Sequence, residues 1–169
     1  MMVLSGIVTE DDVEAIIGDL LSDKGTSRRV FAVSGNDGWV VKEARNPSHH
    51  SNTVEWEVWS EIARTPMAAV FAECAAMSEG GRYLVMERLE PDIGGLPRPA
   101  TPIWLKDRKL SCLGVARDGK VKVLDYGNVD GEAGSRAEAA MHEWPSEAES
   151  ERMKDVLRIL GDDPFGLGG

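Results

Sequence analysis

The chain has little of what marks a secreted, membrane-bound or zinc-binding protein. Its 169 residues include two cysteines, Cys74 and Cys112, which form neither a CxxC pair nor a disulfide framework. The three histidines have no Cys or Glu-x-x-His partner nearby, which argues against a zinc site. No apolar run approaches the ~18 residues of a membrane span. The N-terminus lacks the basic and apolar regions of a secretion signal. We therefore expect a cytoplasmic protein that does not enter a membrane.

Acidic residues outnumber basic residues, and they gather at the two ends of the chain. The formal net charge is −10, from 29 acidic and 19 basic residues. Residues 9–23 hold six acids and no base, and residues 129–169 hold ten acids and four bases. This balance argues against nucleic-acid binding through phosphates. The near-neutral middle leaves room for an anionic small ligand. The acidic ends either keep a small protein soluble or face a partner.

Hydrophobic periodicity and turn residues predict an α+β fold with an antiparallel sheet and a packed helix. Thr9 is the expected N-cap of a first helix, and Asn52 is the expected N-cap of the helix that packs on the sheet. We expect either Trp56 or Trp59 to be largely buried. The predicted elements, in order, are helix 9–22, hairpin 29–34/39–44, helix 52–64, hairpin 70–77/82–88, a Pro- and Gly-rich loop, hairpin 113–127 and helix 146–160.

One short stretch, "GKVKVLDYGN" at residues 119–128, raises a question of function. It reads as a strand that runs directly into Asp125, with an aromatic residue before the next glycine. Asp125 is either an ordinary strand end or a metal-binding aspartate at the mouth of a nucleotide site.

The order of elements resembles that of the small lobe of a protein kinase, and three motifs match it. "WVVKEA" resembles the strand with the ATP-positioning lysine, which gives that role to Lys42. "NTVEWEVW" resembles the following helix, where Glu55, rather than Glu57, is expected to pair with Lys42. "YLVMERLEP" resembles the last strand and hinge, which implies that Glu87 to Leu89 offer backbone groups to adenine, with Met86 at the gate.

Three further motifs extend the resemblance toward the catalytic residues. "LKDRKLSC" is similar to the catalytic loop, which places the base at Asp107 and a phosphate-contacting lysine at Lys109. "LDYG" is similar to the Asp-Phe-Gly element, which makes Asp125 the metal ligand. "SDKGTSRRV" stands where the phosphate-covering loop should be, with Gly25 kept and Arg28 in the place of another glycine. An active site of this kind would take ATP and Mg²⁺.

The chain departs from the kinase pattern in its catalytic loop and in its size. Leu105 and Lys106 replace the histidine and arginine before the catalytic aspartate. Cys112 replaces the metal-binding asparagine, and a thiol is a poor ligand for Mg²⁺. A kinase large lobe does not fit in the residues that remain, so we expect it to be absent.

Residues 24–128 resemble small kinase-like proteins of bacteriophages, which implies a role in the host-cell cytoplasm. The chain then divides into an acidic N-terminal helix (1–23), a reduced kinase-like domain (24–128), and an acidic C-terminal helix and tail (129–169). The leading hypothesis is a protein-binding pseudokinase module with weak or vestigial nucleotide binding, whose partner is a host or phage protein. One alternative is an active reduced protein kinase that phosphorylates a host protein or itself. The other is an acidic inhibitor or particle accessory protein without nucleotide chemistry.

Overall fold

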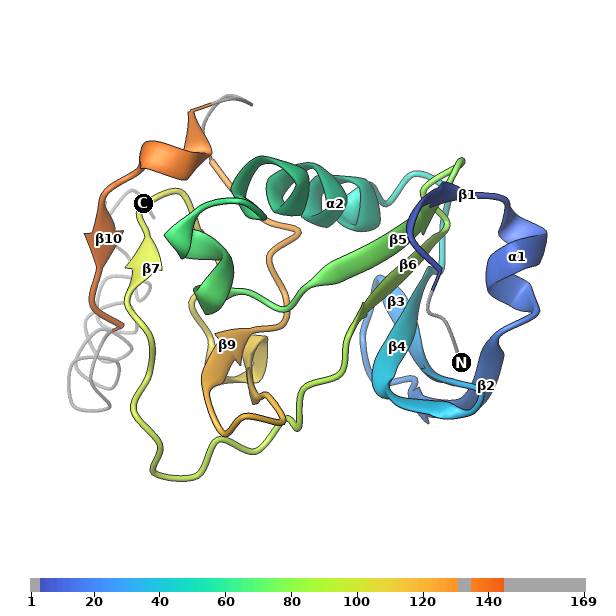
Figure 1. Ribbon diagram of the computed structural model, residues 1–169, viewed down its shortest axis with the longest axis horizontal. Coiled ribbons are helices and arrows are strands. Elements are labelled where there is room, and N and C mark those ends of the chain that lie inside the picture. Colours follow the sequence, from blue (N-terminus) through green and yellow to red (C-terminus); the bar gives the residue numbers. More distant parts are fainter. Residues whose placement is uncertain (1–3, 131–134, 145–169) are drawn as a thin grey trace, which may run out of the picture.

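The structure is a computed structural model that describes residues 4–130 and 135–144. Its main element is a six-stranded sheet with the strand order β1-β5-β6-β4-β3-β2 (Figure 1). All neighbouring strands are antiparallel except β1, which runs parallel to β5. The expected α+β fold with a packed helix is thereby confirmed. The strands are β1 (Gly6–Val8), β2 (Ile17–Ser22), β3 (Arg28–Val33), β4 (Asn36–Ala44), β5 (Cys74–Ser78) and β6 (Tyr83–Glu87).

Two helices cover opposite faces of this sheet. Helix α2 (Ser51–Ile62) lies along one face, and the short helix α1 (Glu10–Glu14) lies beyond the other (Figure 1). The alternation of a β-strand explains why both faces are apolar. On β6, Leu84 and Met86 join the core under α2, whereas Val85 joins Val13 of α1 in a separate core.

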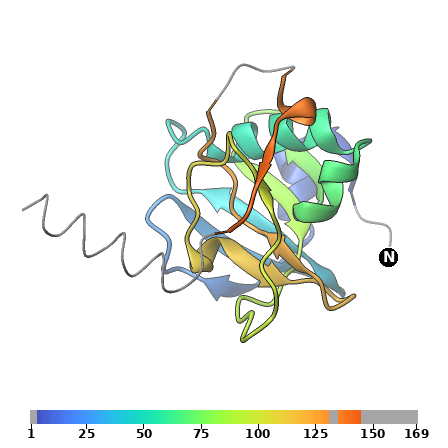
Figure 2. The same cartoon turned by 90° about the vertical axis from the view of Figure 1, so that its left-hand side faces the viewer.

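The remaining elements extend the core on the α2 side. Phe71 follows the 3₁₀ helix η1 (Pro66–Val70), stacks on Trp104 at 5.4 Å between ring centroids and meets Tyr126 edge-on at 5.0 Å. The C-terminal elements face the viewer in Figure 2, where η3 lies beside α2, and β9 packs against η1. These elements are β7 (Thr101–Pro102) paired with β10 (Met141–His142), the hairpin of β8 (Leu113–Val115) and β9 (Val121–Val123), and the 3₁₀ helices η2 (Leu110–Cys112) and η3 (Arg136–Glu138).

The described part of the chain contains no large helical lobe, as expected from the length available. None of its helices is long and apolar enough to cross a membrane. The predicted helix 146–160 lies outside the described residues.

The prediction of one helix over residues 9–22 was wrong in its second half. Thr9 does cap α1, in a capping box with Asp12, but the helix ends at Glu14. Residues 17–22 form β2 instead, and Leu20 pairs with Phe31 of β3. The open edge of β3 supplies hydrogen-bond partners that helical periodicity does not reveal, and Gly18 weakens the helix. Residues 17–22 therefore belong to the same sheet as residues 28–44.

One expectation for α2 was also wrong. His50, not Asn52, occupies the N-cap position, and Asn52 is fully buried inside the first turn. Trp56 and Trp59 are both partly buried and pack against the core. The face turned to the sheet carries Asn52, Glu55, Val58 and Ile62, which mixes polar with apolar side chains.

Candidate functional site

A cavity of about 440 Å³ opens between the sheet and the segment that follows β6. Its walls are mainly apolar, and Lys42 lies among them as a buried cation. Strand alternation places Val40 and Lys42 on the same face of β4, toward α2. The cavity is lined by Leu21, Ser22, Val30, Val40, Lys42, residues 86–91, Ser111 and Leu124.

The Lys42 ammonium is bonded on three sides. Its Nζ donates to both carboxylate oxygens of Glu55 at 3.1 Å and to the Leu124 carbonyl at 2.6 Å. The predicted contact between Lys42 and Glu55 is therefore confirmed. Burial lowers the pKa of Lys42 below its ordinary value, and the adjacent Glu55 offsets part of that effect. Since an ammonium has three N–H donors, Lys42 has none left for another ligand.

Glu55 is the centre of the ion cluster and is fully buried. Besides Lys42, its carboxylate accepts hydrogen bonds from Arg28 Nη1 at 2.6 Å and from the Tyr126 backbone N–H at 3.0 Å. The choice of Glu55 over Glu57 as the partner of Lys42 is confirmed, because Glu57 lies on the exposed side of α2.

Arg28 bridges the two carboxylates of the site. Its Nη2 donates to Asp125 Oδ1 at 2.8 Å, while Nη1 is bonded to Glu55. Burial opposes the charge of Arg28, but Glu55 and Asp125 outweigh it and raise the pKa above the ordinary value. Burial likewise acts to raise the pKa of Asp125, yet Arg28 and then Lys42 lower it below its ordinary value. The shifts of Arg28 and Asp125 both favour the charged forms of this pair.

Asn52 and Tyr126 support this cluster, and the sequence analysis assigned neither of them a supporting role. Asn52 Nδ2 donates to three carbonyls, those of Lys42, Gly81 and Arg82, at 2.9–3.2 Å. Asn52 lies three residues before Glu55, so both face the sheet, and that spacing was the available signal. The Tyr126 hydroxyl donates to the Ala72 carbonyl at 2.7 Å.

The close packing of residues 125–127 on α2 requires the glycine of the "LDYG" motif. A Cβ on Gly127 would lie 2.8 Å from the Ser51 Cβ and 3.1 Å from the Ser51 Cα. Any side chain at position 127 would therefore push this segment away from the start of α2, and with it Asp125.

Asp107 and Lys109 lie at the edge of the cluster. They form an ion pair at 3.1 Å, in which Lys109 is exposed. Burial raises the pKa of the Cys112 thiol, and Asp125 and Asp107 raise it further. Both carboxylates therefore lie near Cys112. The Leu124 N–H donates to the Cys112 carbonyl at 2.8 Å, which fixes the catalytic-loop-like segment beside the Asp125 segment.

Leu89 of the predicted hinge lines the cavity, whereas Gly25 of the predicted phosphate-covering loop does not. Among the described residues, the Leu89 backbone N–H has no protein acceptor, and Leu89 lines the cavity. The Glu87 N–H donates to the Glu73 carbonyl, and its carboxylate accepts from Lys122. Gly25 does not line the cavity, and its carbonyl accepts from Arg45. The roles of Gly25, Glu87 and Leu89 in nucleotide binding stay predictions.

The residues do not fit a magnesium ion. The described residues contain no group of three or more His, Cys, Asp or Glu side chains that could hold a metal. One oxygen of Asp125 is bonded to Arg28, and the nearby Cys112 offers sulfur where Mg²⁺ prefers oxygen.

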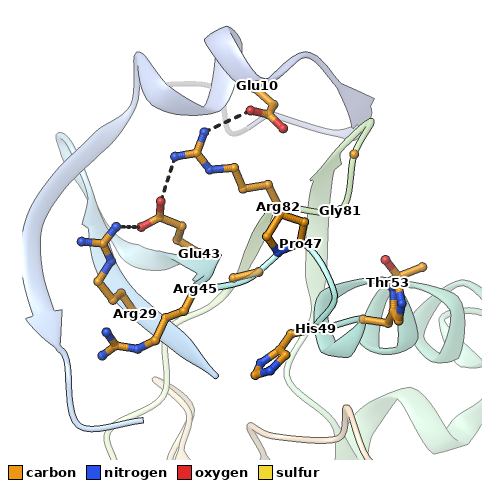
Figure 3. A pocket seen from close by; sticks show the side chains of 12 residues that line it. Glu10, Arg29, Glu43, Arg45, Pro47, His49, Thr53, Gly81 and Arg82 are labelled. Carbon is orange, nitrogen blue, oxygen red and sulfur yellow. Dashed lines mark hydrogen bonds and ion pairs between the residues drawn. The ribbon is translucent and has the colours of Figure 1, made fainter. Parts of the chain in front are cut away.

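A second cavity, of about 530 Å³, lies on the side of the sheet near α1. Figure 3 shows a chain of ion pairs along it, from Arg29 to Glu43, from Glu43 to Arg82, and from Arg82 to Glu10. These ion pairs connect α1 to the sheet.

The comparisons with known proteins give distant structural likenesses. No family model matches the chain, and no curated protein matches it. A solved structure described as "Co-crystal structure of WbdD and kinase inhibitor LY294002" is similar at 13% sequence identity and a TM-score of 0.43. The match covers 89% of this chain and 42% of that one, so this chain spans less than half of the other. The likeness to this structure is coarse.

Proposed function

We propose that this chain is a binding module of the pseudokinase type, which holds a nucleotide weakly and acts by binding a partner protein of host or phage origin in the cytoplasm. One observation carries the proposal. Lys42 lines the cavity and is bonded to Glu55 and to the Leu124 carbonyl, and next to it Arg28 is bonded to Glu55 and Asp125.

This arrangement favours binding over phosphoryl transfer. Transfer requires a lysine that reaches the phosphates and an aspartate that holds a metal ion. Here Lys42 would first have to leave the Leu124 carbonyl, and Asp125 would have to leave Arg28. The apolar walls of the cavity still suit a flat heterocyclic base, and the Leu89 N–H is a donor that such a base could use.

The test combines thermal unfolding with phosphate transfer. We expect millimolar ATP to raise the melting temperature, since a ligand at 100 times its Kd adds about 2.7 kcal/mol. We expect no transfer of radiolabelled phosphate to the chain or to a general protein substrate. Ser111→Trp, at an exposed position that lines the cavity, should abolish the thermal shift. Ser48→Trp, at an exposed position away from the cavity, should keep it.

A shift that persists in Ser111→Trp would place the ligand elsewhere and contradict the proposal. A melting temperature that ATP leaves unchanged would contradict nucleotide binding. That result would favour an acidic inhibitor or particle accessory protein that works through its charge of −10 alone.

An active reduced kinase is the second candidate, and the position of Asp107 favours it. Asp107 and Asp125 both lie near Cys112, which is the neighbourhood that a base and a metal ligand would share. Label transfer in the wild type that disappears in Asp107→Asn would support this function over the pseudokinase.

A further inference from the structure

Arg28 lies between the two carboxylates of the cluster and supplies positive charge that a divalent ion could otherwise supply. Its guanidinium is bonded to Glu55 through Nη1 and to Asp125 through Nη2, and its side chain is 9% exposed. With Lys42 included, the cluster holds two cations and two carboxylates, and its formal charge is zero.

A zero formal charge removes the net attraction that the two carboxylates alone would have for a metal ion. A guanidinium stays protonated at any pH that the folded protein survives, so it cannot make way by losing its proton. An ion at Asp125 would lie beside this fixed positive charge, since Arg28 Nη2 is 2.8 Å from Asp125 Oδ1.

We propose that Arg28 is the resident cation of the ion cluster that adjoins the cavity at Lys42, that Asp125 takes no divalent ion, and that a nucleotide therefore enters the cavity without metal. The exclusion of a metal ion is argued only from the charges and ion pairs of the cluster. The mode of nucleotide entry rests on the proposed function.

The two bonds of Arg28 differ in how easily a phosphate can replace them. The Glu55 carboxylate is fully buried and has other donors around it, so its bond to Nη1 is expected to persist. The Asp125 side chain is 45% exposed, so water can solvate it when it leaves Nη2. A phosphate oxygen takes the place of Asp125 on Nη2, in the charge-assisted geometry for which a guanidinium is suited.

The first arm of the test uses Mn²⁺ alone, followed by electron paramagnetic resonance of the free ion. We expect the wild type to leave millimolar Mn²⁺ free. Binding of one Mn²⁺ per chain that disappears in Asp125→Asn would overturn the proposal, whether or not the chain binds nucleotide.

The second arm measures the thermal shift with ATP in EDTA and in excess Mg²⁺. We expect the wild type to show at least as large a shift in EDTA. Asp125→Asn should bind ATP severalfold more tightly in EDTA, because it removes the charge that competes with phosphate for Arg28. A wild-type shift that requires Mg²⁺, or a shift that Asp125→Asn abolishes, would overturn the proposal. No shift in either condition would contradict nucleotide binding, and the Mn²⁺ arm would still decide the role of Arg28.

A third measurement compares Arg28→Met with Arg29→Met, its half-exposed neighbour on β3. We expect Arg28→Met to lose at least tenfold in ATP affinity in EDTA, and Arg29→Met to stay within twofold of the wild type. Equal affinities in the two variants would overturn the role of Arg28. Circular dichroism confirms that both are folded, and if Arg28→Met is not, the wild type and Asp125→Asn decide the outcome.

Discussion

At the scale of single residues, the protein depends on polar groups that are buried and fully bonded. Each ion pair of the cluster is offset by the cost of removing its charges from water, so the pairs do not simply add to stability. The removal of one member is different, because it leaves an unpaired charge in the interior. Glu55 is the most sensitive member, since three different residues donate to its carboxylate.

The first stability prediction concerns Glu55→Gln. The amide keeps the shape of the side chain but removes the charge that balances Arg28 and Lys42. We expect the free energy of unfolding to fall by about 3–5 kcal/mol, which is the usual cost of breaking a buried pair by removing one partner. Urea denaturation measures it. Glu57→Gln, on the exposed side of the same helix, should change the value by less than about 0.5 kcal/mol. Equal effects of the two substitutions would show that the cluster does not stabilise the fold.

The sequence predicts some members of the cluster better than others, for a physical reason. Lys42 and Glu55 each stand in a short motif that resembles a kinase motif, so the resemblance pointed to both of them. Arg28 and Asn52 owe their positions to contacts between distant segments. The Arg28 side chain reaches Asp125, 97 residues along the chain, and no local pattern encodes that contact.

At the scale of elements, turn residues in the sequence predict the pairing of two strands that follow each other in the chain. They do not predict the pairing of strands that are far apart in the chain. The three hairpins are present because each joins neighbouring strands through residues that favour turns. Strands β1 and β2 instead form the two edges of the sheet. The apolar spacing of residues 13–21 fits a helix equally well, and pairing with β3 decides the outcome.

The second stability prediction concerns the link between η1 and the segment after β9. Tyr126→Phe restores the aromatic residue of the kinase motif but removes the donor to the Ala72 carbonyl. Because both groups are buried, we expect a loss of about 1–3 kcal/mol in urea denaturation at pH 7. Tyr83→Phe is the control, because its hydroxyl bonds to Glu14 near the surface. A larger loss in Tyr83→Phe would contradict this ranking.

The same variant has a defined pH dependence. Burial, and then the nearby Cys74, raises the pKa of Tyr126 well above its ordinary value of 10.0. A raised pKa in the folded state means that the unfolded chain loses its proton first. The stability from Tyr126 is therefore complete below pH 10 and declines as the pH rises above it. The free energies of unfolding of the wild type and Tyr126→Phe should converge above pH 10. A difference between them that grows above pH 10 would contradict a raised pKa of Tyr126.

At the scale of the whole molecule, the sheet and the C-terminal hairpin share one core. Phe71 is fully buried between Trp104 and Tyr126, and its neighbour Ala72 donates its N–H to the Val123 carbonyl. The segment after β6 is also paired with β8 through Glu90 and Val115. This continuity explains how the cavity beside Lys42 keeps its walls, since the hairpin packs on η1 and is bonded to the segment after β6.

The last prediction tests whether these parts unfold as one unit. Cys74 lies on β5 and Cys112 lies at the start of the C-terminal hairpin, and both are buried free thiols. Burial raises the pKa of Cys74 to about 12 and also raises that of Cys112, so neither thiol reacts quickly in the folded state. Labelling then reports opening of the structure around each thiol. We expect Cys74→Ala and Cys112→Ala, each with one remaining thiol, to give labelling free energies equal to their own global values from urea denaturation. If Cys112 instead labels at a free energy several kcal/mol below the global value, the hairpin opens independently of the sheet, and the cleft has a wall that can move.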